Sequence, residues 1–307
     1  MNRIAVLIAA LTLSTTAAFA AEGNFEKTLD VHGAPTLTVE TGAGNVHVYV
    51  GSDTQIHVIG RVHTRPGFRG NESDAEARVR QIVADPPIKQ SGNSVTIGAD
   101  HGNAWLYRGE RDLSIDYEIT APRSTELKAE SGAGNIDIGG IQGIVKGTTG
   151  AGNITVDNIG GNARIETGAG SIRVGNLHGA ASFESGAGNL DLDLTGAGDV
   201  KAETGAGSIR ITGASGGLSA ESGAGSIDVT GDILAEWHVV SGSGNIHINL
   251  GSTAKFNLNA KTRRGSIHTE LPILMQGSLD KQHITGTVNG GGPTLHAETG
   301  SGSIEIR

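Results

Sequence analysis

The sequence predicts an all-β parallel β-solenoid with about 18 residues per coil, plus one short helix in its N-terminal region. Three observations support this fold class. An octet such as Thr167–Val174 (TGAGSIRV) recurs, its copies are evenly spaced, and apolar and polar residues alternate on both sides of each copy. A fixed period of this kind is typical of a solenoid, in which each repeat stacks on its neighbours.

The period is given by the Ser or Thr that opens each octet. These residues are Ser131, Thr149, Thr167, Ser185, Thr204, Ser222, Ser241, Thr262 and Thr299. The steps between them are 18, 18, 18, 19, 18, 19, 21 and 37 residues, so that the last step is close to two periods. From Ser131 to the end we therefore expect about ten coils, which form a rod of ~48 Å at the usual strand spacing.

Each repeat contains two short strands. Apolar residues lie four and two positions before the opening Ser or Thr, as at Ala163 and Ile165, with polar residues between them. After Gly-Ala-Gly the alternation resumes, as at Ile172 and Val174. Alternation with period two predicts strands with one buried face. The glycines then turn the chain, and the Ser and Thr hydroxyls are expected to form a buried column, bonded to one another or to the backbone.

Residues 21–125 are less regular than residues 126–307, and we expect both parts to form one domain. One further octet, Thr41–Val48 (TGAGNVHV), lies far from the main array. Three other stretches are predicted to be strands from their alternation and β-branched residues: Gln55–His63, Ser94–Ala99 and Leu113–Thr120. The N-terminal part is therefore expected to add irregular coils to the array.

One short helix is predicted near residues 73–84. Ser73 and Glu76 have the spacing of a capping box, and one apolar stripe is formed by Ala75, Val79, Ile82 and Val83. Pro86 and Pro87 end the helix, because proline cannot continue it. An open solenoid end exposes strand edges and core, so we expect this helix to act as a cap.

Residues 1–20 are typical of a secretory signal peptide. Arg3 precedes an apolar run, Ile4–Leu13, and Ala18-Phe19-Ala20 matches the pattern of a cleavage site. The rest of the chain has no apolar stretch of the roughly 18 residues that a membrane-spanning helix needs. With no Cys, an exported chain must be held together by packing and hydrogen bonds alone. We expect export to the periplasm, with the cell surface or the medium as alternatives.

The charge of the chain argues against two classes of partner. The formal net charge is −9, and Lys and Arg form no long run. Nucleic acids and anionic membrane surfaces are bound by clustered positive charge, so we expect neither as a partner.

Several stretches share features with known sequences: Tyr117–Pro122 (YEITAP), the array of T/S-G-x-G-N/S-I units, and the tail from Phe256 (FNLNAKTRRGSIHTELPI) to Arg307 (TLHAETGSGSIEIR). Through them the chain resembles the putative-adhesin family of exported bacterial proteins. This is a β-strand-repeat family with a repeat pattern similar to that of the head-GIN domains. The resemblance implies a β-helical fold and a location in the cell envelope. The family has no known function and supplies no catalytic residues.

Two ligand-binding interpretations of the octet are disfavoured. A dinucleotide-binding glycine loop follows a strand and opens a helix, whereas each octet here opens another strand. A calcium-binding nonapeptide repeat needs Asp at a fixed site in every turn. The corresponding outward site varies instead: Asp137, Thr155, Arg173, Asp191, Arg210, Asp228, His247 and His268. This column is predicted to be a solvated ladder of opposite charges.

A zinc site is a further alternative at the end of that column. Asp228, His247 and His268 are expected on adjacent coils, and His and carboxylate side chains are zinc ligands. The alternative is that these three side chains belong to an exposed column of ordinary polar residues and bind no metal.

A second outward column consists of glutamates. The residue before the opening Ser or Thr is Glu in four consecutive coils: Glu166, Glu184, Glu203 and Glu221. Like charges at one strand spacing repel each other, although Arg164 and Lys201, two residues back, are placed to neutralise two of them. The column is either solvated surface or a site for divalent cations, with calcium as the expected ion because it prefers carboxylate oxygens.

No catalytic residues are predicted. Parallel β-helices that cleave polysaccharides place carboxylates in a groove formed by longer coils and long loops, whereas the coils here are minimal. The chain also lacks a Cys nucleophile, a G-x-S-x-G elbow and an H-E-x-x-H motif. A polysaccharide-active enzyme is therefore the less favoured alternative.

Two segments are candidates for contact with partners. Trp105, Tyr107 and Arg108 lie in a predicted loop and are binding-loop candidates for a glycan, or else they anchor that loop to the body. The chain finishes inside a predicted strand, Ser303–Arg307, with no capping helix after it. An unpaired final coil can pair with another strand, so we expect weak self-association through this C-terminal edge.

Together these features predict a non-enzymatic, exported cell-envelope protein. It would present a rigid, repetitive surface to an envelope protein or a glycan, as an adhesin-like protein or a scaffold. A module that binds divalent cations and a polysaccharide-active enzyme are the alternatives.

Overall fold

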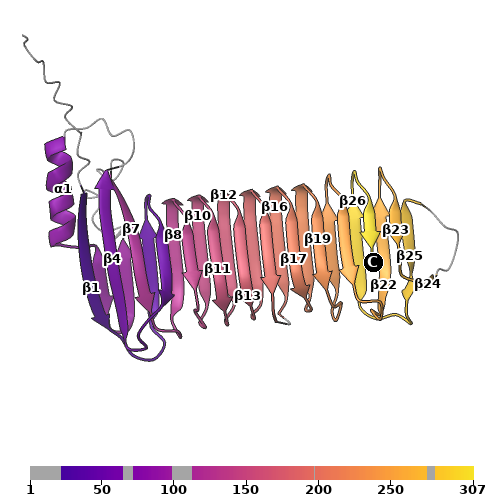
Figure 1. Cartoon of the computed structure of the whole chain (residues 1–307), viewed down its shortest axis with the longest axis horizontal. Coiled ribbons are helices and arrows are strands. Elements are labelled where there is room, and N and C mark those ends of the chain that lie inside the picture. The colour runs from indigo at the N-terminus through magenta and orange to yellow at the C-terminus, as the bar shows by residue number, and fades with distance from the viewer. Residues whose placement is uncertain (1–21, 65–71, 99–112, 197, 275–280) are drawn as a thin grey trace, which may run out of the picture.

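The computed structural model describes residues 22–64, 72–98, 113–196, 198–274 and 281–307. Two long sheets face each other, one of 13 and one of 14 strands, and one helix lies at the N-terminal end (Figure 1). Each repeat contributes one strand to each sheet, and the two glycine-rich turns connect the sheets. The predicted all-β solenoid with about 18 residues per coil is confirmed.

Sheet A has 13 strands. In spatial order they are β1 (Glu22–Asp30), β4 (Gln55–Thr64), β7 (Leu113–Ala121), β3 (Val46–Val50), β9 (Ile136–Gly139), β11 (Ile154–Ile159), β13 (Ile172–Leu177), β15 (Leu190–Leu194), β17 (Ile209–Ala214), β19 (Ile227–Gly231), β21 (Ile246–Leu250), β27 (Ile304–Ile306) and β23 (Ile267–Thr269).

Sheet B has 14 strands. From the N-terminal end of the rod they are β5 (Ile88–Ser91), β6 (Ser94–Gly98), β2 (Thr36–Thr41), β8 (Glu126–Ala133), β10 (Val145–Ala151), β12 (Ala163–Ala169), β14 (Ala181–Ala187), β16 (Val200–Ala206), β18 (Leu218–Ala224), β20 (Trp237–Ser241), β26 (Thr294–Thr299), β22 (Phe256–Thr262), β25 (His283–Val288) and β24 (Ile273–Leu274).

The core lies between the sheets and consists of the residues with the inward phase. Ile165 on β12 pairs with Phe183 on β14, and both are fully buried. Opposite them, Ile172 and Val174 on β13 are also buried. Because neighbouring coils are parallel and in register, residues one repeat apart stack directly on each other, and the core extends without interruption along the rod.

The buried hydroxyl column is confirmed, and its hydroxyls donate to backbone carbonyls. Thr167 is 4% exposed, and its Oγ1 donates to the carbonyl oxygen of Gly152 at 2.9 Å. The same bond, from the opening Ser or Thr to the last glycine of an adjoining coil, recurs at 2.8–3.0 Å for Ser131, Thr149, Ser185, Thr204, Ser222, Ser241, Thr262 and Thr299. Each hydroxyl therefore ties a strand to the turn of an adjoining coil.

Replacement of Thr167 by Val tests one such bond. Thr167→Val keeps the shape of the side chain but removes the donor, which leaves the Gly152 carbonyl without this partner. We expect the free energy of unfolding in urea to fall by about 1–2 kcal/mol. Thr167→Ser keeps the hydroxyl and is the matched control. An equal loss in both variants would show that the methyl group, and not the hydrogen bond, carries the effect.

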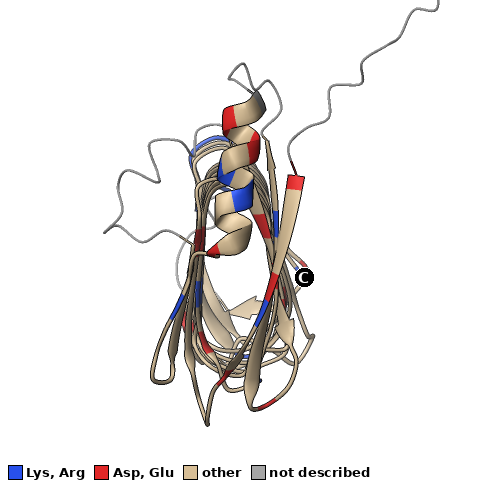
Figure 2. Ribbon diagram, turned by 90° about the vertical axis from the view of Figure 1, so that its left-hand side faces the viewer, with Lys and Arg blue, Asp and Glu red and all other residues tan. Residues whose placement is uncertain are grey.

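The N-terminal end of the rod is irregular and is covered by the helix. Strands β1, β4 and β7 pair antiparallel, as do β5 and β6. Helix α1 (Glu72–Ala84) packs against β1 and β4 with Ala75 and Val79 buried. It lies across the end of the two sheets (Figure 2). The predicted helix and its position over the end of the rod are confirmed, as are the predicted strands, which correspond to β4, β6 and β7. The helix begins at Glu72, so Ser73 lies in its first turn and not at the N-cap position that the capping box predicted.

At the C-terminal end the spatial order of the coils departs from their order in the chain. Strand β26 lies between β20 and β22, and β27 lies between β21 and β23. The prediction that the final strand forms an open edge is therefore wrong, because β27 is paired on both sides. The sheets end instead at β23 and at β24, which continues the antiparallel pairing of β25 with β22.

Helix α1 is 13 residues long. Among the described residues, no helix combines the length and the apolar character that crossing a membrane requires.

Candidate binding surfaces

The glutamate column lies on the outer face of sheet B as predicted. Glu166, Glu184, Glu203 and Glu221 are direct register partners on four consecutive parallel strands. The sequence pattern sufficed to place them together, because a side-chain column in an in-register parallel sheet follows directly from the repeat length.

Two of these four carboxylates have cationic partners on their own strands. Arg164 Nε contacts Glu166, and Lys201 Nζ lies 2.7 Å from Glu203 Oε1, as the sequence predicted. The hydrogen bond to Glu203 raises the pKa of Lys201, so this ammonium stays charged over the whole physiological range. Glu184 is exposed, and no ion pair at Glu184 or Glu221 is present within the described residues. The column therefore has two ion pairs for four carboxylates, and the charge of Lys201 also acts on Glu184 and Glu221.

The outer face of sheet A carries the second column. Its members, in spatial order, are Glu118, His47, Asp137, Thr155, Arg173, Asp191, Arg210, Asp228, His247, Glu305 and His268. Some neighbours in this column contact each other: Arg173 Nε lies 3.7 Å from Asp191 Oδ2, and His47 Nδ1 lies 2.9 Å from Asp137 Oδ2. The predicted stacking of Asp191, Arg210 and Asp228 is confirmed, although among the described residues Arg210 forms no ion pair with either aspartate.

The predicted zinc trio is wrong. Asp228 and His247 do contact each other, with 2.8 Å between Oδ1 and Nδ1, but His268 is not beside them. Glu305 of the inserted strand β27 separates the two histidines. Across the described part of the chain, no three His, Cys, Asp or Glu side chains are arranged to hold a metal ion.

A pair of histidines on sheet B was not singled out from the sequence. His238 on β20 and His296 on β26 stack with ring centroids 4.7 Å apart and an interplanar angle of 5°. Burial lowers the pKa of His296, and the charge of His238 lowers it further, against the opposing effect of Glu298, whose Oε2 lies 3.8 Å from His296 Nε2. The sequence did not indicate this pair, because β20 and β26 become neighbours only through the insertion of β26 between β20 and β22.

The histidine pair makes stability depend on pH. Because the folded-state pKa of His296 lies below its ordinary value of 6.5, the unfolded chain takes up a proton first as the pH falls. The thermal midpoint is therefore expected to fall as the pH drops through 6.5 and below. In His296→Gln this part of the fall disappears, whereas the exposed His268→Gln retains it. Identical midpoint-against-pH curves for wild type and His296→Gln would contradict the assignment.

The turn after each first strand presents a third repeated feature, a ladder of Asn and Ser side chains. Asn135 Oδ1 accepts a hydrogen bond from the Asn153 amide at 2.9 Å, and Asn153 Oδ1 accepts one from the Ser171 amide at 2.8 Å. Further along, Asn189 Oδ1 accepts from the Ser208 amide in the same way. The N/S position of the octet thus has a structural role that sequence reasoning missed, although its restriction to these residues was a usable signal.

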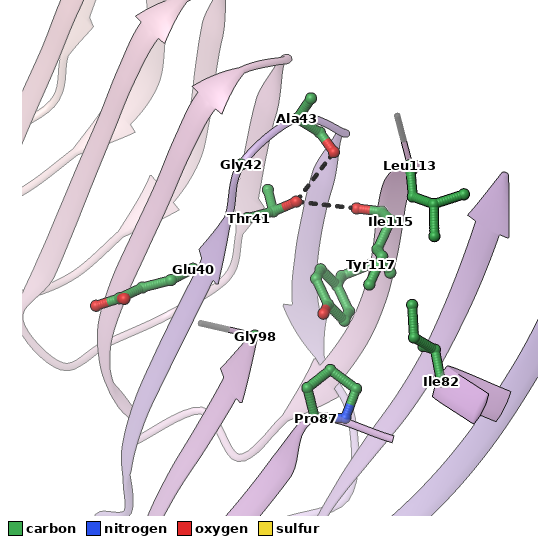
Figure 3. Close-up of a pocket in the computed structure, with 10 residues that line it drawn as sticks. All are labelled: Glu40, Thr41, Gly42, Ala43, Ile82, Pro87, Gly98, Leu113, Ile115 and Tyr117. Carbon is green, nitrogen blue, oxygen red and sulfur yellow. Dashed lines mark hydrogen bonds between the residues drawn. The ribbon is translucent and has the colours of Figure 1, made fainter. Parts of the chain in front are cut away.

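A small pocket lies beneath the helix at the N-terminal end. It is lined by Glu40, Thr41, Gly42, Ala43, Ile82, Pro87, Gly98, Leu113, Ile115 and Tyr117 (Figure 3). Thr41 Oγ1 donates to the carbonyls of Ala43 at 3.0 Å and Ile115 at 3.2 Å. The pocket therefore lies between helix α1, the turn after β2 and strand β7.

The binding-loop candidates Trp105, Tyr107 and Arg108 lie outside the described residues. The same holds for residues 1–20, which were predicted to be a signal peptide. The binding-loop and signal-peptide interpretations therefore remain predictions.

Several solved structures align along nearly the whole chain at low identity. A putative adhesin from Bacteroides fragilis is 13% identical, with 93% of this chain and 97% of that chain covered and a TM-score of 0.41. A putative lipid binding protein from Parabacteroides distasonis is 12% identical, with 92% and 96% covered and a TM-score of 0.33. A putative cell adhesion protein from Clostridium sporogenes is 12% identical, with 92% and 99% covered and a TM-score of 0.21. Likeness at this level assigns no ligand to this chain.

No curated protein matches the chain. A family model described as Toastrack DUF4097 matches residues 70–307, which include helix α1 and most strands of both sheets. This match covers far more than half of the chain and confirms the resemblance seen in the sequence to a family of repeat proteins without an assigned function. The chain belongs to the Toastrack DUF4097 family.

Proposed function

We propose that this chain is a non-enzymatic, exported cell-envelope protein that binds a partner through the outer face of one of its two sheets. One observation carries the proposal: the coils are minimal and in register, so each face is a long, even surface along which polar and charged side chains stack in columns. Rigid repetitive surfaces of this kind suit binding to extended partners, as in other solenoids. A buried reaction site needs a concave surface, which short turns between strands do not build.

Export is the second part of the proposal. It is supported by the apolar run Ile4–Leu13 and by Ala18-Phe19-Ala20, which fit a signal peptide and its cleavage site. The expected location is the periplasm, and the expected partner is an envelope protein or a glycan. Fractionation of cells that express the chain, with N-terminal sequencing of the mature form, checks this part independently of binding.

Site-specific photo-crosslinking in the native envelope tests the binding face. A photoreactive residue replaces Ser182 or Ser219 on sheet B, beside the glutamate column, and Thr155 or Thr212 on sheet A. We expect a discrete adduct from both positions on one face and from neither position on the other, which is the matched control. The absence of adducts from all four positions, or turnover of a polysaccharide by the purified protein, would overturn the proposal.

Binding of a divalent cation is a second candidate function, supported by two glutamates of the column, Glu184 and Glu221, that form no ion pair among the described residues. Since no three ligand side chains converge there within the described part of the chain, such an ion would be held by two neighbouring carboxylates and otherwise by water. The carboxylates of Glu184 and Glu203 lie on neighbouring strands and are in direct register. If the column binds calcium, millimolar calcium raises the thermal midpoint by about 2–4 °C. Replacement of both residues by Gln abolishes this shift, while Asp191→Asn on the opposite face retains it. A midpoint that is indifferent to calcium identifies the column as solvated surface.

A further inference from the structure

The last coil of the chain occupies a gap between two coils that precede it in the sequence. Strand β26 pairs in parallel register with β20 on one side and β22 on the other, and β27 pairs with β21 and β23. The chain leaves β21, skips one coil position to form β22 and β23, and returns through β25 to fill the position that it skipped. Without residues 294–307, this position would be an open slot with strand edges on both sides.

The contacts in this slot are the same as those between any other two coils. Leu295 and Ala297 of β26, and Ile304 and Ile306 of β27, are fully buried. Thr299 Oγ1 donates to the Gly244 carbonyl at 2.8 Å, and the hydroxyl of Thr262 donates to the Gly302 carbonyl at 2.9 Å. Since these contacts involve only the coil and the walls of the slot, a coil supplied by another copy of the chain would make them equally well.

The segment before the last coil has the composition of a hinge. Residues 289–293 read NGGGP, and three consecutive residues have positive φ: Asn289 at 48°, Gly290 at 91° and Gly291 at 82°. Asn289 holds this turn to the loop before β22, because its Nδ2 donates to the carbonyls of Ser252 at 3.2 Å and Ala254 at 2.9 Å. When extended, five residues reach up to ~17 Å.

We propose that two copies of the chain associate by exchanging their last coils, so that residues 294–307 of each copy fill the slot of the other. This exchange differs from edge pairing of the final strand, because no new interface is needed at the rim of the sheets. The closed monomer and the exchanged dimer share the same contacts in the slot, and protein concentration and the conformation of the hinge set the balance between them.

Disulfide trapping between two differently tagged chains tests the exchange. One chain carries His247→Cys on β21 and the other carries Glu305→Cys on β27, positions that are direct register partners at a strand spacing compatible with a disulfide. The chain has no other Cys. After incubation at high concentration below the thermal midpoint and mild oxidation, we expect a covalent heterodimer in ~10-fold excess over the control mixture, because exchange replaces random collision by proximity.

The control mixture combines Arg210→Cys and Asp228→Cys, which are register partners on β17 and β19 in the middle of the rod. Those coils stack in the same order as in the chain, so no slot of this kind exists between them. A second variant, in which Gly290 and Gly291 are deleted, shortens the hinge and is expected to increase the heterodimer further, because a short hinge strains the closed form. A heterodimer yield equal to the control in both hinge backgrounds would overturn the proposal.

Discussion

Gly170→Ala is expected to lower the free energy of unfolding by about 3 kcal/mol, a large effect for the addition of one methyl group. Gly170 is the last residue of a Gly-Ala-Gly turn and has a φ of 155°, which side-chain-bearing residues rarely adopt. A Cβ atom at this position would lie 2.0 Å from the carbonyl oxygen of Gly152 in the preceding coil. This is the carbonyl that accepts the hydrogen bond of Thr167, so neither backbone nor hydroxyl can move away without loss.

Denaturant unfolding and hydrogen exchange together check this result. Hydrogen exchange is expected to accelerate most in β10 and β12, whose coils meet at the altered turn. Gly251→Ala is the matched control, because a Cβ atom at Gly251 would have no neighbour within 4 Å. There we expect no loss, and at most a gain of about 1 kcal/mol through the restricted unfolded chain. Equal losses at both glycines would refute the steric explanation.

Trp237→Ala is expected to be at least as damaging, with a loss of about 4 kcal/mol. Trp237 is fully buried on β20, between Leu218 of β18 and Leu295 of β26. Its indole Nε1 donates to the carbonyl of Gly216 at 3.0 Å. Truncation therefore leaves a cavity in the core next to the inserted coil and removes the partner of a backbone carbonyl.

The variant Trp237→Phe separates these two contributions. Phenylalanine keeps most of the buried volume but cannot donate to Gly216, so we expect it to lose only about 1–2 kcal/mol. Thermal unfolding followed by far-UV circular dichroism measures both variants against wild type. Should Trp237→Phe be as unstable as Trp237→Ala, the hydrogen bond and not the packing would be the main contribution of this side chain.

The regular part of the fold follows from the sequence because one physical rule covers it. Alternation placed Ile165 and Phe183 inward, and the repeat length then placed Glu184 beside Glu203. Both are consequences of period two along a strand and of in-register stacking between strands. No knowledge of distant pairing is needed, since each coil contacts only its neighbours.

The order of the last coils does not follow in the same way. Because every coil offers nearly the same edge, the sequence does not specify which coil stacks on β21, and the insertion of β27 depends on pairing between segments far apart in the chain. This insertion separated His247 from His268 and brought His238 against His296. The irregular steps of 21 and 37 residues before Thr262 and Thr299 are the signal in the sequence that the regular stacking order ends there.

The hydroxyl-to-carbonyl bond between consecutive coils also bears on how such a protein changes length during evolution. Thr167 bonds to Gly152, and Ser185 bonds to Gly170 in the same way. Removal of residues 168–185 would join Thr167 directly to Gly186, and the Gly-Ala-Gly turn and the hydroxyl-to-carbonyl bonds on both sides of the junction would keep their order. We therefore expect the rod to lengthen or shorten by whole coils, so that selection can adjust its reach in steps of one strand spacing.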